Sequence, residues 1–413
     1  MKDERQSERI RFRLNDEAET FKRRERKHEK GFSGLVILAV ILFFLFWFSV
    51  LLLVPYKQWS FDPAYFFETV SRNFKEFFAF VFGTRSAPGM QGRFISCLAA
   101  IVAGAALASC GAVFQGSFRN ALAGPSTMGV MTGGTLGVLA YLLIFVPAHP
   151  EVVNEVHTQE MLDAQAARPL YEVYTQQLFV FAGCLIAVAL ILGISMTAGH
   201  GKVSGPAMII SGTVFSAGIN NVIQIVQYYM LVKDPTDTRI DSIRDMMLGN
   251  LNDITSFRTL ALMSVPILIC LVILLCVRNR LNLLSFGEDE ALIMGMNVHR
   301  YRVFLTIIST IMTASVVSFC GQIGFMGFMI PLVGRKIAGP NMKYLLPACM
   351  MLGAMMLLVV YDVACFMGMQ DSLNIFTSSV GCIVMIFVLI GKKGDRSGAA
   401  FQGRFPQGMG IRP

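Results

Sequence analysis

The sequence predicts an all-α membrane protein with about ten transmembrane helices. Its 413 residues are 54% hydrophobic and only 15% charged, whereas a soluble chain carries about 25% charged residues. Several uncharged runs are long enough to cross a bilayer, which takes about 20 apolar residues in a helix. These runs are continuous, while the strands of a membrane barrel alternate between apolar and polar residues, so the pattern argues against strands.

Residues 34–391 are expected to form the transmembrane domain. A charged cytoplasmic tail, 1–33, precedes it, and a flexible cytoplasmic tail, 392–413, follows it. The first apolar run, 34–54, is too long for a signal-peptide core and has no cleavage site after it, which predicts an uncleaved span. The other nine expected spans are 94–114, 127–146, 177–196, 205–229, 258–277, 302–319, 323–337, 344–366 and 373–391.

The boundary between the spans 302–319 and 323–337 depends on a glycine-rich heptapeptide. The chain is uncharged from Val303 to Gly334, which is too long for one crossing. GQIGFMG, at Gly321–Gly327, is the natural break because glycine permits backbone conformations that end a helix.

Charge asymmetry places both termini on the cytoplasmic side. Membrane proteins collect Lys and Arg in cytoplasmic loops, so the net charge of +8 reflects topology rather than nucleic-acid binding. The expected outer segment, 147–176, has five acidic residues against one base, Arg168. The basic residues of the expected inner segments are Arg119, Lys202, Arg278, Arg280, Arg300, Arg302, Arg335, Lys336, Lys343, Lys392 and Lys393.

Nothing in the sequence indicates an enzyme. The nine cysteines lie in apolar segments and show neither a CxxC pair nor metal-ligand spacing. The stretch Gly199–Ser204 lacks the spacing and the hydroxyl neighbour of a P-loop. No nucleophile–base–acid set is recognisable. We therefore expect a transport subunit with no catalytic residue, no metal site and no cofactor of its own.

The fifth expected span carries a stripe of polar side chains. Spacings of three or four residues place them within one narrow arc of a helix. Such groups are costly at membrane depth unless they meet partners or water. The stripe predicts the lining of an aqueous substrate path, although hydrogen bonding between helices would use the same residues. The stripe consists of Thr213, Ser216, Asn220, Gln224 and Gln227.

A row of small residues in the second expected span predicts close helix packing. Ala100, Gly104, Ala108 and Ala112 follow one another at intervals of four residues. Small residues at this spacing let two membrane helices approach each other closely. We interpret the row as structural.

The loop Leu284–Arg300 predicts a short helix outside the membrane. Ser285 is a plausible N-cap, and the acidic residues 288–290 suit the positive end of a first turn. Gly295 can end this helix in a left-handed conformation, and a second short helix is expected to begin near Asn297. The apolar face of such a helix must be covered, either by the membrane surface or by a partner protein.

Three stretches resemble one known family. They are GAVFQGSFRNALAGPSTMGVMTGG, LNLLSFGEDEALIMGMNVHRYR and GQIGFMGFMIPLVGRKIAGPNMKYLLP, which occur in family order between about 92 and 391. They resemble the FecCD family, the permease subunits of ABC importers for iron–siderophore, haem and cobalamin. The resemblance implies the fold of these permeases, with about ten transmembrane helices.

The resemblance also implies partners. They are a second permease subunit, expected to be an identical copy, two cytoplasmic ATPase subunits that use ATP-Mg, and an extracytoplasmic substrate-binding protein. The location would be the bacterial cytoplasmic (inner) membrane, in contact with lipid and not with nucleic acid. Iron–siderophore leads among the implied cargoes because it is the commonest in the family, and haem and cobalamin stay open.

Three groups of residues take roles from the resemblance. Arg93 aligns with an arginine that receives the binding protein at the outer end of the second span. The cytoplasmic turn between the second and third spans, with a structural and switching role, includes Gln115, Arg119, Asn120 and Pro125. The loop that couples to the ATPase includes Ser285, Gly287, Glu288, Ala291, Leu292 and Gly295.

The chain departs from the family pattern mainly on the outer side. The first arginine and the proline of the family's RxPR motif are Met90 and Gly92 here, and an outer arginine aligns with Cys365. Other departures are Gly124 for an acid, Leu332 for the histidine of PHxxR, and Ser372-Leu373-Asn374 for PxG. The segment 147–176 is expected to supply a replacement contact of opposite charge polarity.

Two other function classes compete with an importer. An ion-coupled secondary transporter of a polar solute needs ionisable residues within its spans, and Asp362 is the acid clearly inside an apolar segment. The resembling family also has an acid there. A membrane scaffold would not need the polar stripe of the fifth span.

Overall fold

The computed structural model describes residues 33–50, 71–72, 74–78, 88–146, 174–199, 201, 203–254 and 256–391. The expectations for most of the N-terminal tail, for the tail after Gly391 and for the acidic segment 147–173 lie outside these residues. The same is true of the end of the first span beyond Val50.

Every regular element among the described residues is a helix, which confirms the predicted class. The first helix is Ser33–Val50. The labelled helices that follow are α3 (Pro88–Phe118), α4 (Val130–Phe145), α7 (Thr175–Ala198), α8 (Gly205–Lys233), α9 (Arg239–Leu248), α10 (Phe257–Phe286), α11 (Glu288–Ile293), α12 (Val298–Cys320), α13 (Met326–Ala338), α14 (Met342–Phe366) and α15 (Leu373–Gly391).

Each of the ten predicted spans corresponds to a helix. Seven helices in the described residues are long and apolar enough to cross a membrane. The helices α4, α13 and α15 fill the other three predicted positions. Helix α4 and the apolar part of α15, Leu373–Phe387, are shorter than the seven. Several helices extend beyond the predicted spans, α3 and α10 most of all. Helix α12 begins at Val298 rather than at 302, so the separate helix expected near Asn297 is the start of α12. The short helix α9, after α8, was not predicted.

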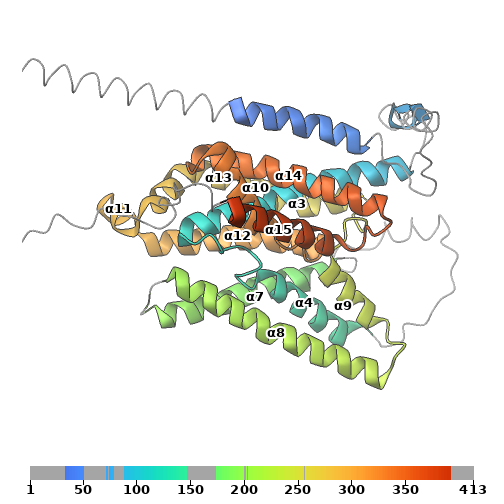
Figure 1. Cartoon of the computed structure of the whole chain (residues 1–413). Coiled ribbons are helices and arrows are strands. Elements are labelled where there is room, and N and C mark those ends of the chain that lie inside the picture. Colours follow the sequence, from blue (N-terminus) through green and yellow to red (C-terminus); the bar gives the residue numbers. More distant parts are fainter. Residues whose placement is uncertain are drawn as a thin grey trace, which may run out of the picture.

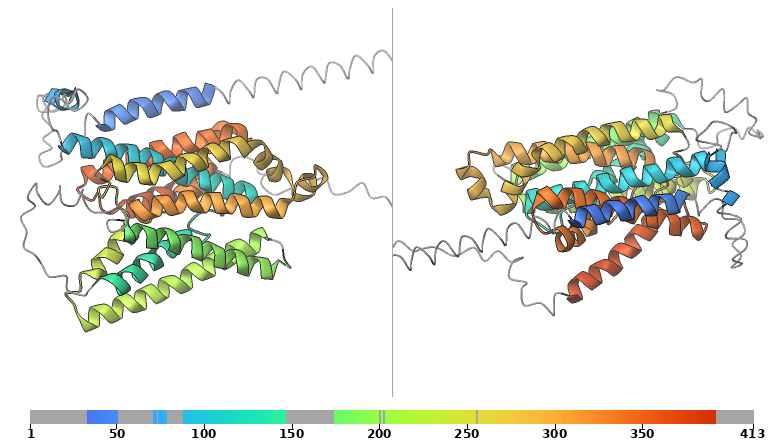
Figure 2. Two further views of the ribbon diagram at one scale, coloured as in Figure 1. Left: turned by 180° about the vertical axis from the view of Figure 1, so that it is seen from behind. Right: turned by 90° about the horizontal axis from the view of Figure 1, so that it is seen from above.

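The long helices lie roughly side by side, so the bundle has two ends (Figure 1). One end carries α11, which projects beyond its neighbours, and the opposite end carries α9. We call these the α11 end and the α9 end. The first helix and α8 lie at opposite edges of the bundle in both Figures 1 and 2.

The centre of the bundle is built around α3, which contacts α14, α13, α12 and α10. The predicted row of small residues faces α14, and this confirms its packing role. A Cβ added to Gly353 of α14 would lie 2.3 Å from the carbonyl oxygen of Gly104 and 2.5 Å from the Cβ of Ala108. Only glycine permits so close an approach of two backbones.

The predicted break within 302–337 is confirmed. Helix α12 ends at Cys320 and α13 begins at Met326. The intervening backbone is held by α15 and by α9. Asn374 Oδ1 accepts from the backbone N–H of Gly324 at 2.9 Å, and the N–H of Gln322 donates to the carbonyl of Met246 at 2.8 Å. These contacts satisfy polar backbone groups that would be costly at membrane depth.

Candidate functional site

The turn between α3 and α4 is joined to α13 through a buried amide. Gln115, near the end of α3, is 3% exposed. Its Nε2 donates to the carbonyl oxygen of Phe328 at 2.9 Å, and its Oε1 accepts from Arg335 Nη1. One side chain therefore links the last turn of α3 to both the first and the last turn of α13.

The remaining turn residues shape the backbone between α3 and α4. Arg119 has a left-handed φ of 51°, and Asn120 Oδ1 accepts from the N–H of Leu122 at 2.8 Å. Pro125 is buried against Gly327, where an added Cβ would lie 2.6 Å from the proline Cδ. The predicted turn residues thus lie together in one turn, and Gln115 and Pro125 of this turn contact α13.

Sequence reasoning missed a second link at this end, made by Arg302. This arginine of α12 is 4% exposed. It donates to the carbonyl oxygen of Ser117 at 3.1 Å and to that of Val203 at 3.2 Å. Helix α12, which follows α11, is therefore hydrogen-bonded to the end of α3 and to the residues before α8. A basic residue at the first position of a predicted apolar span is the signal that could have identified it.

The short helix α11 occupies the predicted ATPase-coupling loop, and it presents an apolar tip. The exposed fractions of the side chains are 57% for Leu292, 85% for Ile293 and 70% for Met294. Ile293 is the most exposed large hydrophobic residue described. Gly295 has a φ of 76°, and the N–H groups of Gly295 and Met296 donate to carbonyls of α11, which confirms the predicted left-handed end of this helix.

Two details of the predicted coupling loop are wrong. Ser285 is not the N-cap, because α10 continues to Phe286 and Gly287 is the capping residue before Glu288. Ala291 is fully buried, so it packs inside the loop and does not face a partner. Of the predicted residues, Leu292 is the large apolar side chain that this loop exposes, together with Ile293 and Met294, which the prediction left out.

The predicted polar stripe lies on the weakly covered helix α8. In its most apolar window only 11% of the residues are buried, because α8 contacts its main neighbours, α7 and α4, on one side. No side-chain hydrogen bond to another described residue is formed by Asn220, Gln224 or Gln227. The hydroxyl of Thr213 donates to two carbonyl oxygens of its own helix, at 3.0 and 2.9 Å. Ser216 Oγ is buried and has no partner among the described groups.

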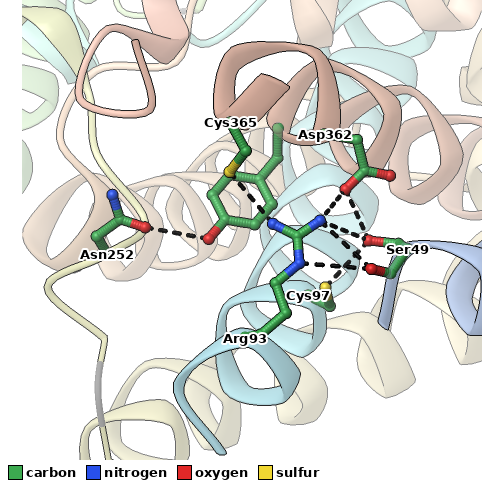
Figure 3. A network of polar contacts seen from close by, with 7 residues as sticks. Ser49, Arg93, Cys97, Asn252, Asp362 and Cys365 are labelled. Atoms are coloured by element: carbon green, nitrogen blue, oxygen red, sulfur yellow. Dashed lines mark hydrogen bonds and ion pairs between the residues drawn. The ribbon is translucent and has the colours of Figure 1, made fainter. Parts of the chain in front are cut away.

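Arg93 is buried, although a docking role predicts that it is exposed. The residue is 8% exposed, and it forms an ion pair with Asp362 of α14 (Figure 3). Its Nη2 also donates to Ser49 Oγ at 3.1 Å, and its Nη1 to Cys365 Sγ at 3.2 Å. The guanidinium lies 4.7 Å from the ring centre of Tyr361. A guanidinium with internal partners does not present its charge to an external protein.

The described surface of the α9 end carries acidic residues. Asp253 and Asp371 are exposed there, and each accepts a side-chain amide hydrogen bond, from Asn250 at 3.2 Å and from Asn252 at 3.1 Å. Partial burial raises the pKa of Asp253, and the charge of Asp371 raises it further. Asp253 also lines a pocket of about 210 Å³ beside α7 and α9.

The sequence model of the FecCD transport family matches residues 41–391. This chain belongs to the FecCD transport family. The match spans the first helix through α15 and includes both the α3–α4 turn and the α11 loop. The family resemblance stated from the motifs is therefore confirmed.

Two relatives are permease proteins of different import systems. The chain is 31% identical over 269 residues to the Fe(3+)-citrate import system permease protein YfmE of Bacillus subtilis, covering 65% of this chain and 71% of the relative. It is 28% identical to the cobalamin import system permease protein BtuC of Halobacterium salinarum, covering 69% of each.

A solved structure also matches this fold. It is a metal-chelate type ABC transporter in an inward-facing conformation, with a TM-score of 0.64 and 24% identity. The match covers 87% of this chain and 99% of that one. At this level of identity the likeness shows the fold alone.

Proposed function

We propose that this chain is the membrane-spanning subunit of an importer that carries a metal chelate into the cytoplasm, driven by two separate ATPase subunits. The observation that carries the proposal is the apolar tip of α11, at one end of a FecCD-type bundle. Iron–siderophore is the first cargo to test, and haem and cobalamin follow, because the two relatives named above import an iron chelate and cobalamin.

The ATPase subunits would bind at the α11 end. Leu292, Ile293 and Met294 offer exposed apolar side chains on a loop that otherwise carries charge, and a cluster of this kind suits a groove of a protein partner. ATP-Mg would be bound by the ATPases, since this chain has no P-loop. Movement of α11 would reach α10 and α12 directly, because α11 is joined to both by turns of one to four residues.

The movement would spread further through the two buried links of this end. Arg302 connects α12 to the end of α3, and Gln115 connects the end of α3 to α13. Both links use hydrogen bonds to backbone carbonyls, so they fix the relative positions of helices rather than of side chains alone. Closure of the ATPases would then tilt these helices as one unit, a rigid-body change between two states.

A second copy of this chain would cover α8 and complete the path. Part of the polar stripe lies on the exposed face of α8, where Thr213 and Gln224 are exposed, and the other stripe residues are partly buried. Apolar residues such as Ile225 and Tyr228 are 68% and 70% exposed on this helix. Amides and hydroxyls facing hydrocarbon are unfavourable. Water between two facing copies of α8 would solvate them, and the uncharged lining suits a bulky polar cargo.

The delivering protein would dock at the α9 end, outside the membrane. Arg93 is internally paired there, and exposed acids such as Asp253 and Asp371 are present instead. This supports the expected reversal of charge polarity, with basic side chains on the delivery protein. Charge pairs steer and orient partners as they meet. A high salt concentration should therefore slow the association of the delivery protein with this chain.

The orientation follows from the same distribution of charge. The α11 end carries basic residues such as Arg280, Arg300 and Lys343, whereas the α9 end carries several aspartates. By the positive-inside rule the α11 end is cytoplasmic. The location is the bacterial cytoplasmic membrane, with both termini inside.

Uptake measurements in cells test this function. Cells without the chain, complemented with the wild type, should take up labelled ferric siderophore or ferric citrate, haemin or cobalamin. Uptake should persist when an ionophore collapses ion gradients while ATP is maintained. Uptake that stops with the ionophore, although ATP is intact, would instead favour an ion-coupled secondary transporter. Asp362 would then be the acid to examine, although its pairing with Arg93 does not favour that role.

A further inference from the structure

A pocket of about 460 Å³ opens at the α11 end, between α10, α12 and the turn that joins α11 to α12. Arg280, near the end of α10, and Arg300, in the first turn of α12, both line it. Both residues are exposed, and neither forms a salt bridge with another described residue. Two guanidinium groups therefore share one pocket, and no carboxylate among the side chains that the structure describes pairs with either of them.

The rest of the pocket is largely apolar. Leu283, Met294 and Phe304 contribute to the lining, and Phe304 is 40% exposed. The hydroxyl of Tyr301 donates to the carbonyl oxygen of Val277 at 3.0 Å, which fixes the tyrosine between α12 and α10. The pocket thus combines cationic groups with an apolar floor of defined shape.

The α12 side of the pocket continues into an apolar face. Phe304 follows Arg300 by four residues and Ile307 follows by seven, so all three lie on one face of the helix. Phe304 and Ile307 are 40% and 46% exposed. This face has a guanidinium at its membrane-surface end and uncovered apolar side chains toward the membrane interior.

The same arrangement occurs on α10, which packs beside α12. Cys276, Val272 and Ile269 precede Arg280 at spacings of four, four and three residues, which again places them on one helix face. Val272 is 59% exposed and Ile269 is 56% exposed. Two adjacent helices therefore each carry an arginine toward the α11 end of the bundle, next to an exposed apolar face.

We propose that this pocket binds the headgroup of an anionic phospholipid of the adjoining leaflet. The two arginines would hold the phosphodiester, because a guanidinium donates in a fork that matches phosphate oxygens. The acyl chains would lie along the apolar faces of α10 and α12 that continue from the pocket. Basic pockets between membrane helices on the cytoplasmic side suit such headgroups.

The shape of this surface favours a lipid over an acidic side chain of a partner protein. A carboxylate would engage the arginines alone, whereas a phospholipid would engage them with its headgroup and also place its acyl chains on the apolar faces directly below. The bound lipid would also touch the turn Met294–Met296, which follows the apolar tip of α11. It would therefore hold the coupling loop in position. This inference rests on the proposed function only for the role of that loop and for the naming of the cytoplasmic leaflet.

Lipid retention by the full-length chain tests the proposal. The chain is purified in mild detergent with equal amounts of phosphatidylglycerol and phosphatidylcholine, and bound lipids are counted by native mass spectrometry. We expect the wild type to retain phosphatidylglycerol at least tenfold over phosphatidylcholine, and the double variant Arg280→Gln/Arg300→Gln to lose this preference. Arg258→Gln is the matched control, because Arg258 is an exposed arginine at the other end of the same helix.

Three results would overturn the proposal. One is equal retention of phosphatidylglycerol by the wild type and the double variant. Another is an equal loss in Arg258→Gln. The third is thermal stabilisation by glycerol 3-phosphate as large as that by phosphatidylglycerol, which would indicate a site for soluble phosphate. If the double variant does not fold, the two single variants provide the same comparison.

The lipid measurement can fail independently of the proposed function, because phosphatidylglycerol retention is measured on the purified chain without an ATPase. A double variant that keeps phosphatidylglycerol but loses co-purifying ATPase would assign the arginines to a carboxylate of that partner, against the lipid. Loss of lipid with unchanged ATPase binding would support the lipid site. An absent ATPase in both proteins would contradict the proposed function alone.

Discussion

Arg93 of α3 and Asp362 of α14 form a buried ion pair that Ser49 of the first helix completes. Ser49 Oγ donates to Asp362 Oδ1 at 2.7 Å, so three helices meet at one polar centre. Tyr361, whose ring lies against Arg93, donates to Asn252 Oδ1 at 3.0 Å. The centre therefore also reaches the loop before α10. We conclude that Arg93 joins the first helix, α3 and α14 through buried polar contacts.

Replacing Asp362 by Asn should destabilise the folded chain strongly. The change leaves the Arg93 guanidinium buried without a counter-charge, and breaking a buried pair in this way costs about 3–5 kcal/mol. Thermal unfolding in detergent measures the effect. The double variant Arg93→Met/Asp362→Leu should recover much of the loss, because it removes both charges.

A surface pair supplies the control for this experiment. Asp241 and Arg244 form an ion pair at 2.9 Å with side chains that are 61% and 63% exposed. Such pairs contribute about 0–1 kcal/mol, so Asp241→Asn should change the unfolding temperature little. Equal effects of the two aspartate substitutions would contradict the structural role of the buried pair.

Gln115→Leu should slow transport and lower stability. The substitution removes the hydrogen bonds to Phe328 and Arg335, and an unsatisfied buried polar group costs about 1–3 kcal/mol. Gln115→Glu should keep more uptake than Gln115→Leu, because a carboxylate can still accept from Arg335. Uptake rates at matched expression distinguish the two variants, and a better result for leucine would refute the proposed link between α3 and α13.

Lowering the pH should destabilise the loop between α8 and α9, because it protonates Asp237. Arg239 donates to both carboxylate oxygens of Asp237, at 2.9 and 2.7 Å, and to the carbonyl of Val146 at 3.3 Å. These hydrogen bonds hold the pKa of Asp237 below its ordinary value of 3.8. Their contribution to stability is therefore complete above that value, and it is lost as the pH falls through the lower pKa of the folded chain.

The comparison with Asp237→Asn isolates this effect. The wild type should unfold at a higher temperature than the variant at pH 7, and the difference should shrink as the pH falls below about 4. Thermal unfolding of both proteins between pH 7 and pH 3 gives the result. A difference that stays constant across this range would exclude Asp237 as its source.

The polar stripe on α8 should be accessible to water in the assembled transporter. Cysteines introduced as Asn220→Cys and Gln224→Cys should react with a membrane-impermeant maleimide, in a background where exposed Cys276 and Cys382 are replaced by serine. Val272→Cys, on the exposed apolar face of α10, should not react because it faces lipid. Equal labelling at all three positions would contradict a path along α8.

The spans and their breaks could be predicted from the sequence because they depend on local composition. The break at GQIGFMG and the left-handed Gly295 are encoded by nearby glycines. The small residues around Gly104 likewise predicted a close helix contact. In each case the deciding residues lie within one or two turns of each other.

The burial of Arg93 could not be predicted, because its partner Asp362 is 269 residues away in the chain. The alignment of Arg93 with a docking arginine gave no information on that contact. Ala291 and Ile293 are also hard to distinguish by sequence, since both are apolar residues of one short helix. Only the fold determines that one is buried and the other is 85% exposed.

The most direct test is to purify the tagged chain gently from its native cells and identify the bound proteins by mass spectrometry. A Walker-type ATPase should co-purify with the wild type. The variant Ile293→Glu should lose it, because a charge replaces the most exposed apolar side chain of α11. Met367→Glu, at the α9 end and 56% exposed, should keep it. The absence of an ATPase from the wild type, under conditions that preserve a control transporter, would contradict the account.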